Sequence, residues 1–216
     1  MVGVYLGNCR RQYSTVWCGE MTKRLTAQAW IDFALATLAH GGVEALKAEV
    51  LARKLGVSRG SFYWHFHDLG AFHAKVIERW RQTTTEAVIA DLERYASAEQ
   101  RLHALLRRAF RHKAVLEVHM RTWAENNAAA AQAVNEVDHR RRAYIERMLA
   151  GAGITPSLAA TRAQLLYWTY LGAALSRSKL TGQRLERMVS ELGWIGLGAP
   201  DERAAMSRRA RRRQRG

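Results

Sequence analysis

Residues 55–66 read LGVSRGSFYWHF, and this stretch constrains the fold more than any other part of the chain. The segment before it has apolar residues at i, i+3, i+4 and i+7, the spacing of a helix with one apolar face: Ala48, Leu51, Ala52 and Leu55. Gly56 suits a left-handed exit from that helix, and Ser58 suits the N-cap of the next one. Phe62 and Phe66, four residues apart, can pin the second helix onto the first. This order of residues predicts a helix-turn-helix.

The flanking sequence predicts further helices around this motif. An amphipathic helix of about 15 residues is indicated by one repeated spacing: Ile31, Ala34, Leu35, Leu38 and Ala39. Thr26 is available as its N-cap, and Gly41-Gly42 can end it. Asp68 is a good N-cap for another helix, which contains three further apolar positions: Phe72, Val76 and Trp80. We therefore expect residues 22–82 to form a compact three-helix head that leads into a long fourth helix.

Residues 25–80 resemble the DNA-binding head of the tetracycline-repressor (TetR) family. The matching stretches are ALATLAHGGVEAL, LARKLGVS and GSFYWHF, and the last resembles a subgroup motif. The resemblance implies an all-α fold of about nine helices, in which a divergent helical domain follows the head, dimerises and often binds a small effector. The match is looser over residues 100–195, where MRTWAENN and VNEVDHRRRAYIERML look like the sixth and seventh helices of such regulators.

Residues 83–200 are the predicted dimerisation and ligand-binding domain. Helices are expected at residues 98–113, 115–127, 129–151, 156–179 and 182–197. The stretch LLYWTYLGAAL, residues 165–175, is apolar on nearly all sides, so we expect it to pack on its own core and on a partner subunit. The residues expected in this dimer face are Trp168, Leu171, Gly172, Leu175, Met188, Leu192 and Trp194.

The same domain offers polar groups among aromatic side chains, which suits a pocket for a small amphipathic effector. The candidate ligand-binding residues are Glu117, His119, Arg121, Trp123, Asn126, Tyr144, Tyr167, Trp168 and Tyr170. Each of them is also explained by packing or by a surface position. No cofactor is expected, and no metal site, because the HxxxH and CxxC spacings are absent.

The second helix of the motif is expected to enter the major groove, where base edges carry a distinct donor and acceptor code. Arg59 suits guanine O6 and N7, and an indole at Trp64 could meet a thymine methyl group. The resemblance implies phosphate contacts for Tyr63 and His65. The complete set expected at DNA is Lys23, Arg24, Lys47, Ser58, Arg59, Gly60, Ser61, Tyr63, Trp64 and His65.

Two positions depart from the family pattern. Leu69, followed by Gly70, stands where relatives usually have a Lys or Arg that reaches the DNA backbone. Lys47 stands where relatives usually have a Thr or Ser that opens the helix. Lys47 could supply a replacement positive charge for phosphate, although it loses the cap.

Charge alone does not identify the partner. The chain has 34 Lys and Arg against 19 Asp and Glu, a net charge of +15 that is spread along its length. Such a charge favours nucleic acid, but it fits a non-specific nucleoid-type protein as well as a regulator, and the motif favours the regulator. No P-loop and no paired catalytic carboxylates indicate an enzyme. We expect a cytoplasmic homodimeric regulator of an inverted-repeat site on double-stranded DNA, a repressor released by an unknown small-molecule effector, with no membrane partner.

The two ends of the chain stand apart from the predicted domains. Residues 1–21 contain both cysteines, and we expect Met21 to be the natural start. The alternative is a real arm that touches DNA or forms a redox disulfide. Residues 201–216 are rich in arginine without an apolar face, so we expect a disordered, solvated tail, with non-specific attraction to DNA as the alternative.

Overall fold

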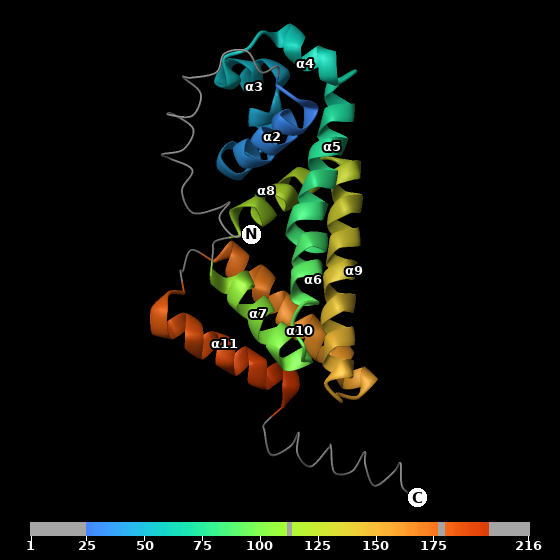
Figure 1. Ribbon diagram of the computed structural model, residues 1–216, viewed down its shortest axis with the longest axis vertical. Helices are drawn as coiled ribbons and strands as arrows, with labels where there is room; N and C mark the ends of the chain where they lie inside the picture. Colours follow the sequence, from blue (N-terminus) through green and yellow to red (C-terminus); the bar gives the residue numbers. More distant parts are fainter. Residues whose placement is uncertain (1–24, 112–113, 177–179, 199–216) are drawn as a thin grey trace, which may run out of the picture.

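A computed structural model of the chain describes residues 25–111, 114–176 and 180–198. These residues form helices and connecting turns, with no β-strand among them (Figure 1). The helical elements are α2 (Ala27–Gly41), η1 (Val43–Leu46), α3 (Ala48–Leu55), α4 (Arg59–His65), α5 (Leu69–Arg81), η2 (Gln82–Glu86), α6 (Ala87–Leu92), α7 (Ala98–Arg111), α8 (Val115–Ala124), α9 (Ala128–Gly151), α10 (Pro156–Leu175) and α11 (Gly182–Leu197). The π-helical turn η2 joins α5 to α6 in one long helix. The described part of the chain therefore has the all-α architecture of about nine helices that the sequence predicts.

The residues predicted to begin and end the helices of the head have the expected backbone geometry. The side chain of Thr26 accepts a hydrogen bond from the Ala29 backbone N–H at 3.1 Å, and Asp68 accepts one from Ala71 at 2.7 Å. Gly56 has φ 69° and ψ 27°, the left-handed conformation that a residue with a Cβ resists. Ser58 occupies the N-cap position of α4, but its hydroxyl makes no capping hydrogen bond. The predicted helix starts and stops are thus confirmed, whereas the predicted bond from Ser58 is absent.

The body helices also lie where the sequence places them, although two of them end earlier than predicted. The second of them ends at Ala124, because the side chain of Asn127 caps the next helix by accepting from the Ala130 N–H at 2.9 Å. The fourth ends at Leu175, where the extended backbone of Ser176 stops it. These ends correct the predicted ranges by a few residues.

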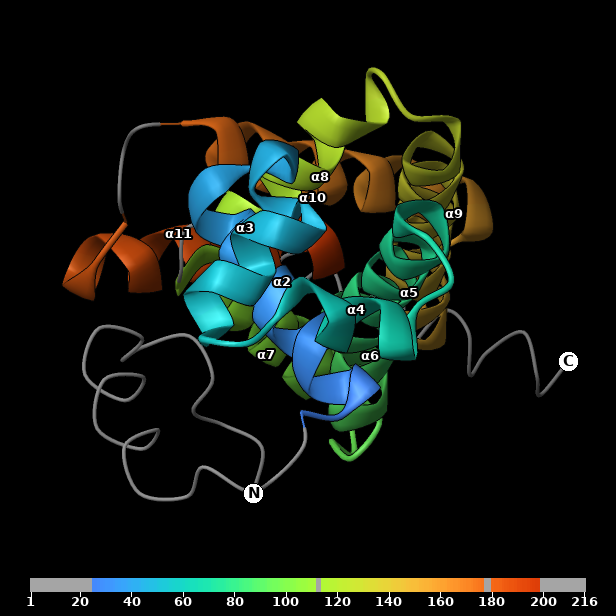
Figure 2. The same cartoon turned by 90° about the horizontal axis from the view of Figure 1, so that it is seen from above.

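The hydrophobic core consists of two clusters. The upper cluster combines the apolar residues of the head with six residues from α8 and α9: Met120, Trp123, Ala130, Ala133, Val134 and Val137. Figure 1 shows the head helices grouped at one end of the molecule, and Figure 2 shows α5 and α9 side by side. The packing therefore continues across residues 82 and 83, where the sequence predicts the domain boundary.

The lower cluster fills the other end of the body, between α6, α7, α9, α10 and α11. Gly196 brings α11 close to α7, because a Cβ built there would lie 2.8 Å from a methyl carbon of Leu102. Leu192 is buried in this same cluster, on the face of α11 that also carries Leu185 and Val189. Its side chain is thus committed to its own subunit, which corrects its assignment to the dimer face.

None of the helices in the described ranges combines the length and the hydropathy needed to cross a bilayer.

The shared upper cluster predicts that a change in α8 destabilises the head. Trp123 is 5% exposed, and replacing it with alanine should lower the free energy of unfolding by about 3–5 kcal/mol. Trp64, which is 76% exposed, provides a matched control, and Trp64→Ala should change stability by less than about 0.5 kcal/mol. Chemical denaturation followed by circular dichroism measures both. A head transition that stays unchanged in Trp123→Ala would contradict a shared core.

The contact between the head and α8 also predicts a pH dependence. The ring of His73 meets Trp123 edge to face with centroids 5.0 Å apart, and burial lowers the pKa of His73 although a hydrogen bond to the Leu46 backbone opposes the shift. Below about pH 6.5 the unfolded chain binds a proton at this histidine more readily than the folded chain does, so stability should fall as the pH drops through that value.

The histidine contribution is isolated by comparison with His73→Phe, which keeps a ring against Trp123. Unfolding free energies of both proteins, measured from pH 8 to pH 5, should diverge below about pH 6.5, with the wild type losing more stability. Parallel curves would show that His73 does not contribute.

Candidate nucleic-acid interface and interior polar network

Helix α4 is held in place by aromatic packing. Phe62 is fully buried, and its ring centroid lies 5.5 Å from that of Trp30, 5.1 Å from Phe66 and 5.0 Å from Phe72. Phe66 is 6% exposed. The two phenylalanines predicted to pin this helix therefore do so, and they fix which face of α4 points outward.

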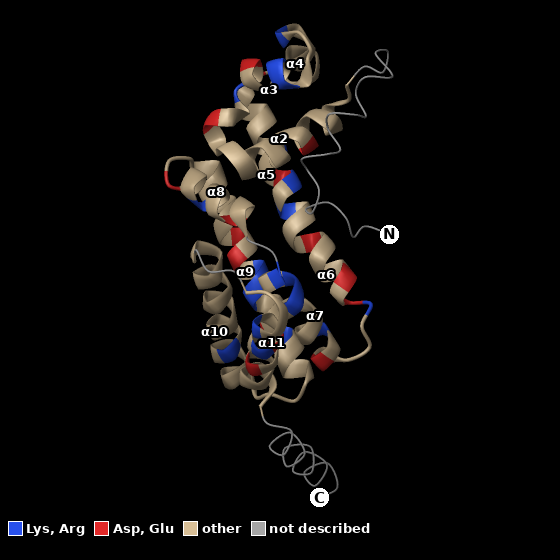
Figure 3. Cartoon of the chain, turned by 90° about the vertical axis from the view of Figure 1, so that its left-hand side faces the viewer, with Lys and Arg blue, Asp and Glu red and all other residues tan. Residues whose placement is uncertain are grey.

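The outward face carries most of the residues that the sequence assigns to DNA. Tyr63 is 46% exposed and Trp64 is 76% exposed. Ser58, Arg59 and Gly60 are also exposed, whereas Ser61 and His65 are half-buried. Basic residues lie on α3 and α4 but also along the body, as Figure 3 shows. The head therefore presents an aromatic and basic surface, within a chain whose charge is not confined to it.

Arg59 and Tyr63 form a pair on this face. One guanidinium nitrogen of Arg59 donates to the Tyr63 hydroxyl at 3.1 Å, and the guanidinium carbon lies 5.4 Å from the centroid of the tyrosine ring. The two side chains are one helical turn apart, so the tyrosine can orient the arginine before any ligand arrives.

The remaining positions of the expected DNA set behave differently. Lys47 is exposed, but its ammonium pairs with Glu44 at 2.8 Å, and this hydrogen bond raises the pKa of Lys47. Leu69 is half-buried against the upper cluster, so this position contributes packing, whereas the resemblance implies a basic residue here. Lys23 and Arg24 lie outside the described residues, as do the two terminal segments.

A network of charged and hydroxyl groups lies inside the body. The carboxylate of Glu117 is 4% exposed and accepts from Arg121 at 2.8 Å and from Arg141 at 2.9 Å. Arg121 also donates to Asp138 and to the hydroxyl of Tyr167. Since a buried charge is costly unless it is paired, the network must form as a unit.

Burial and pairing act against each other on the pKa values of this network. Burial alone would lower the pKa of Arg141, but the charge of Glu117 raises it above its ordinary value. Burial and the charge of Glu117 raise the pKa of Tyr170 to about 12. Both groups therefore keep their protons at neutral pH, and the two arginines offset the two carboxylates, Glu117 and Asp138.

The predicted ligand-binding residues separate into groups. Glu117, Arg121, Tyr167 and Tyr170 converge in the network. The others are dispersed: Trp123 and Tyr144 are buried in the upper and lower clusters respectively, Asn126 and Trp168 are exposed, and His119 is half-buried beside Gly42. The predicted set is thus not one pocket. Within the described ranges, no group of three or more His, Cys, Asp or Glu could hold a metal ion.

Sequence reasoning missed four residues of this network: Asp138 and Arg141, and Thr84 and Thr85, whose hydroxyl groups accept hydrogen bonds from Arg141. The run Arg140-Arg141-Arg142 looks like a solvated charge cluster. However, Arg141 lies four residues after Val137 and three before Tyr144, both buried on α9. The helical spacing from Val137 to Arg141 and Tyr144 therefore indicates that this arginine points inward.

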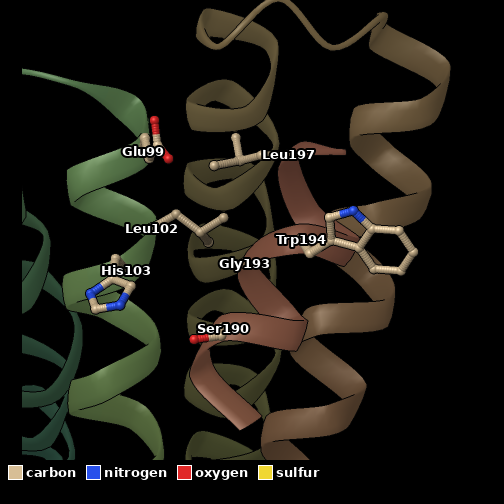
Figure 4. A pocket seen from close by; sticks show the side chains of 7 residues that line it. All are labelled: Glu99, Leu102, His103, Ser190, Gly193, Trp194 and Leu197. Atoms are coloured by element: carbon tan, nitrogen blue, oxygen red, sulfur yellow. The ribbon is translucent and has the colours of Figure 1, made fainter. Parts of the chain in front are cut away.

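An apolar surface runs over α10 and α11. Its exposed members include Leu165, Trp168, Leu175, Trp194 and Ile195. Of the other residues predicted for the dimer face, Gly172 is exposed, and Leu171 and Met188 are half-buried. Next to this surface, a hollow of about 250 Å³ lies between α7 and α11. Figure 4 shows Glu99 and His103 on one side of it and the Trp194 ring turned away.

Comparison with known proteins identifies the head. Residues 31–68 match the model of bacterial regulatory proteins of the tetR family. Among curated proteins, none matches the chain.

Solved structures show the fold of the chain beyond the head. The reduced form of NemR from E. coli is 18% identical, with 78% of this chain and 96% of that chain covered and a TM-score of 0.65. A transcriptional regulator from Rhodococcus sp. Rha1 is 22% identical, with 79% and 95% covered and a TM-score of 0.66. One from Saccharomonospora viridis, in complex with choline, is 17% identical, with 80% and 96% covered and a TM-score of 0.64. Residues 31–68 thus match the N-terminal domain of the tetR family, and the chain has the fold of these solved structures.

Proposed function

We propose that this protein is a homodimeric, sequence-specific transcriptional repressor that a small-molecule effector releases from DNA. The observation that carries the proposal is the geometry of α4, where Phe62 and Phe66 are buried while Arg59, Tyr63 and Trp64 face outward. We also assign the head to a subgroup defined by the recognition-helix sequence GSFYWHF.

In this proposal α4 lies in the major groove. Arg59 reads guanine, because a guanidinium can bond O6 and N7 together, and Trp64 contacts a thymine methyl group. The groups that position the head on the phosphate backbone are Lys23, Arg24, Lys47, Ser58, Gly60, Ser61, Tyr63 and His65. Lys47 must exchange its bond to Glu44 for a phosphate, which reduces its net contribution.

The apolar surface of α10 and α11 is the proposed dimer face. Trp168, Leu175 and Trp194 are 61%, 69% and 55% exposed, a concentration of large apolar side chains that is typical of an interaction site. A symmetric dimer presents two recognition helices about 34 Å apart, one turn of DNA, so the operator should be an inverted repeat.

The proposed effector acts by a population shift. A molecule that binds better to a conformer with misplaced heads lowers operator affinity by the ratio of its affinities for the two states. Choline is bound in the similar structure from Saccharomonospora viridis and stearoyl-CoA in that of FadR from Bacillus subtilis, so this fold accommodates very different molecules. We propose that the effector acts on the interior network, whose side chains belong to α8, α9 and α10.

If Arg59 contacts a base, selection from a random pool of double-stranded DNA at near-physiological salt should distinguish the wild type from Arg59→Ala. The wild type should enrich an inverted repeat, and Arg59→Ala should bind that site about 10- to 100-fold more weakly and lose preference at one base pair of each half-site. Arg187→Ala, which removes one exposed charge from α11, is the control and should keep the same motif. Enrichment without any motif would support the non-specific nucleoid-type alternative, for which the distributed positive charge is the argument.

The proposed dimer face predicts that one charge on α10 separates the subunits. Trp168→Glu should shift the protein from dimer to monomer at micromolar concentration, because burying an unpaired carboxylate in an apolar interface is costly. Sedimentation equilibrium measures this shift. Trp64→Glu places the same charge at a similarly exposed tryptophan in the head and should leave the dimer intact. A Trp168→Glu protein that stays dimeric would assign the interface to another surface.

A further inference from the structure

The turn η2 interrupts the helix that joins the head to the body. In a π-helical turn each N–H bonds to the carbonyl five residues earlier, so the turn holds one residue more than the α-helix around it. Two side chains of η2 bond to the carbonyls before it: Thr83 donates to Arg79 O and Thr84 donates to Trp80 O, both at 2.8 Å. The extra residue is thus accommodated by local hydrogen bonds.

Helix α9 holds this turn with two consecutive arginines. Arg141 donates to Thr85 Oγ1 at 3.0 Å, to Thr84 Oγ1 at 3.2 Å and to the Thr84 carbonyl oxygen at 3.4 Å. Arg140 donates to both carboxylate oxygens of Glu86, at 3.2 and 3.1 Å. The Arg140 pair is partly solvated, whereas the side chain of Arg141 is only 13% exposed. The Arg141 attachment is therefore the one shielded from solvent and salt.

Arg141 is itself held by groups outside the turn. Its guanidinium pairs with Glu117 at 2.9 Å and lies 5.8 Å from the ring centroids of both Trp80 and Tyr170. Glu117 belongs to α8 and Tyr170 to α10, so one side chain connects the π turn to three helices of the body. A change in the position of α8 or α10 acts directly on the group that holds the turn.

We infer that Arg141 is a positioning residue that keeps η2 in its π form and thereby sets the rotation of the head relative to the body. If the turn regularised to an α-helix with its extra residue included, α5 and the head would rotate by about 100° and move by about 1.5 Å relative to α6. Such a rotation would take the recognition helix away from its groove. The inference rests on the proposed function, and it deepens that proposal by naming the element that links the interior network to DNA.

The experiment compares operator affinity among three proteins. Arg141→Met removes the hydrogen bonds from Arg141 to η2, which we call the latch. The double variant Thr84→Val, Thr85→Val removes two acceptors of the latch. It leaves the Arg141–Glu117 pair intact, which protects against misfolding. Arg142→Met is the matched control, because Arg142 donates to the Asp138 carbonyl and to Gln164 instead of the turn. Both latch variants should bind the selected operator at least roughly tenfold more weakly than the control, as loss of charge-assisted hydrogen bonds implies.

Deletion of Gln82 separates positioning from packing. Gln82 is an exposed residue of η2, and removing it takes away the extra residue, so an unbroken α-helix can form without rotating the head. In this background Arg141→Met should no longer weaken operator binding. If it weakens binding as much as in the full-length helix, or if neither latch variant weakens binding in the first place, the inference is wrong.

A second measurement does not depend on DNA. Amide hydrogen exchange over residues 82–92 in the free protein should accelerate in Arg141→Met and return to the wild-type rate when Gln82 is also deleted. If the rate of amide hydrogen exchange over residues 82–92 is the same in Arg141→Met as in the wild type, the inference that Arg141 holds η2 is wrong. Failure of the wild type to select any operator would overturn the proposed function alone, because this readout would still report on the turn.

Discussion

The burial of the Phe62 ring determines what the head can present to a ligand. Three aromatic rings, those of Trp30, Phe66 and Phe72, surround it at centroid distances of 5.0–5.5 Å. Each such pair contributes about 0.5–1.5 kcal/mol beyond the area it buries. Since successive residues of a helix point in directions about 100° apart, anchoring Phe62 fixes the outward directions of Arg59, Tyr63 and Trp64. The side chains that α4 exposes are thus determined by the buried packing of Phe62.

The head could be predicted from sequence because its geometry is encoded locally. Thr26 and Asp68 accept backbone hydrogen bonds within their own helix starts, and Gly56 adopts a conformation that its own backbone permits. The helices of the body could be placed for the same reason. Which side each helix turns toward its neighbours depends on tertiary contacts, and this is where prediction failed. Leu192 was expected at a partner subunit and is buried in the lower cluster. Arg141 is not among the residues predicted from sequence, and it is buried among three helices.

The interior network shows why such a residue is hard to foresee. A buried arginine is unfavourable until Glu117 is present, and a buried Glu117 is unfavourable until its two arginines are present. No single position in the sequence signals this mutual dependence. The participating side chains come from η2, α8, α9 and α10, so the polar groups of the body are matched across elements that are distant in sequence. The predicted ligand set found four members of this group because they combine charge with aromatic rings, and it missed the residues whose neighbours along the chain are themselves charged or small.

Because the upper cluster extends from the head into α8 and α9, the head cannot be joined to the body of another protein without loss of packing. Met120 and Trp123 on α8, together with the first turns of α9, complete the core of the head. A chimera that joins residues 25–81 to the body of another regulator would replace these side chains and leave apolar surface of the head exposed to solvent. The head of this protein is therefore not a portable module, and transferring its DNA preference to another scaffold requires either grafting the α8 and α9 contacts with it or transplanting only the outward residues of α4.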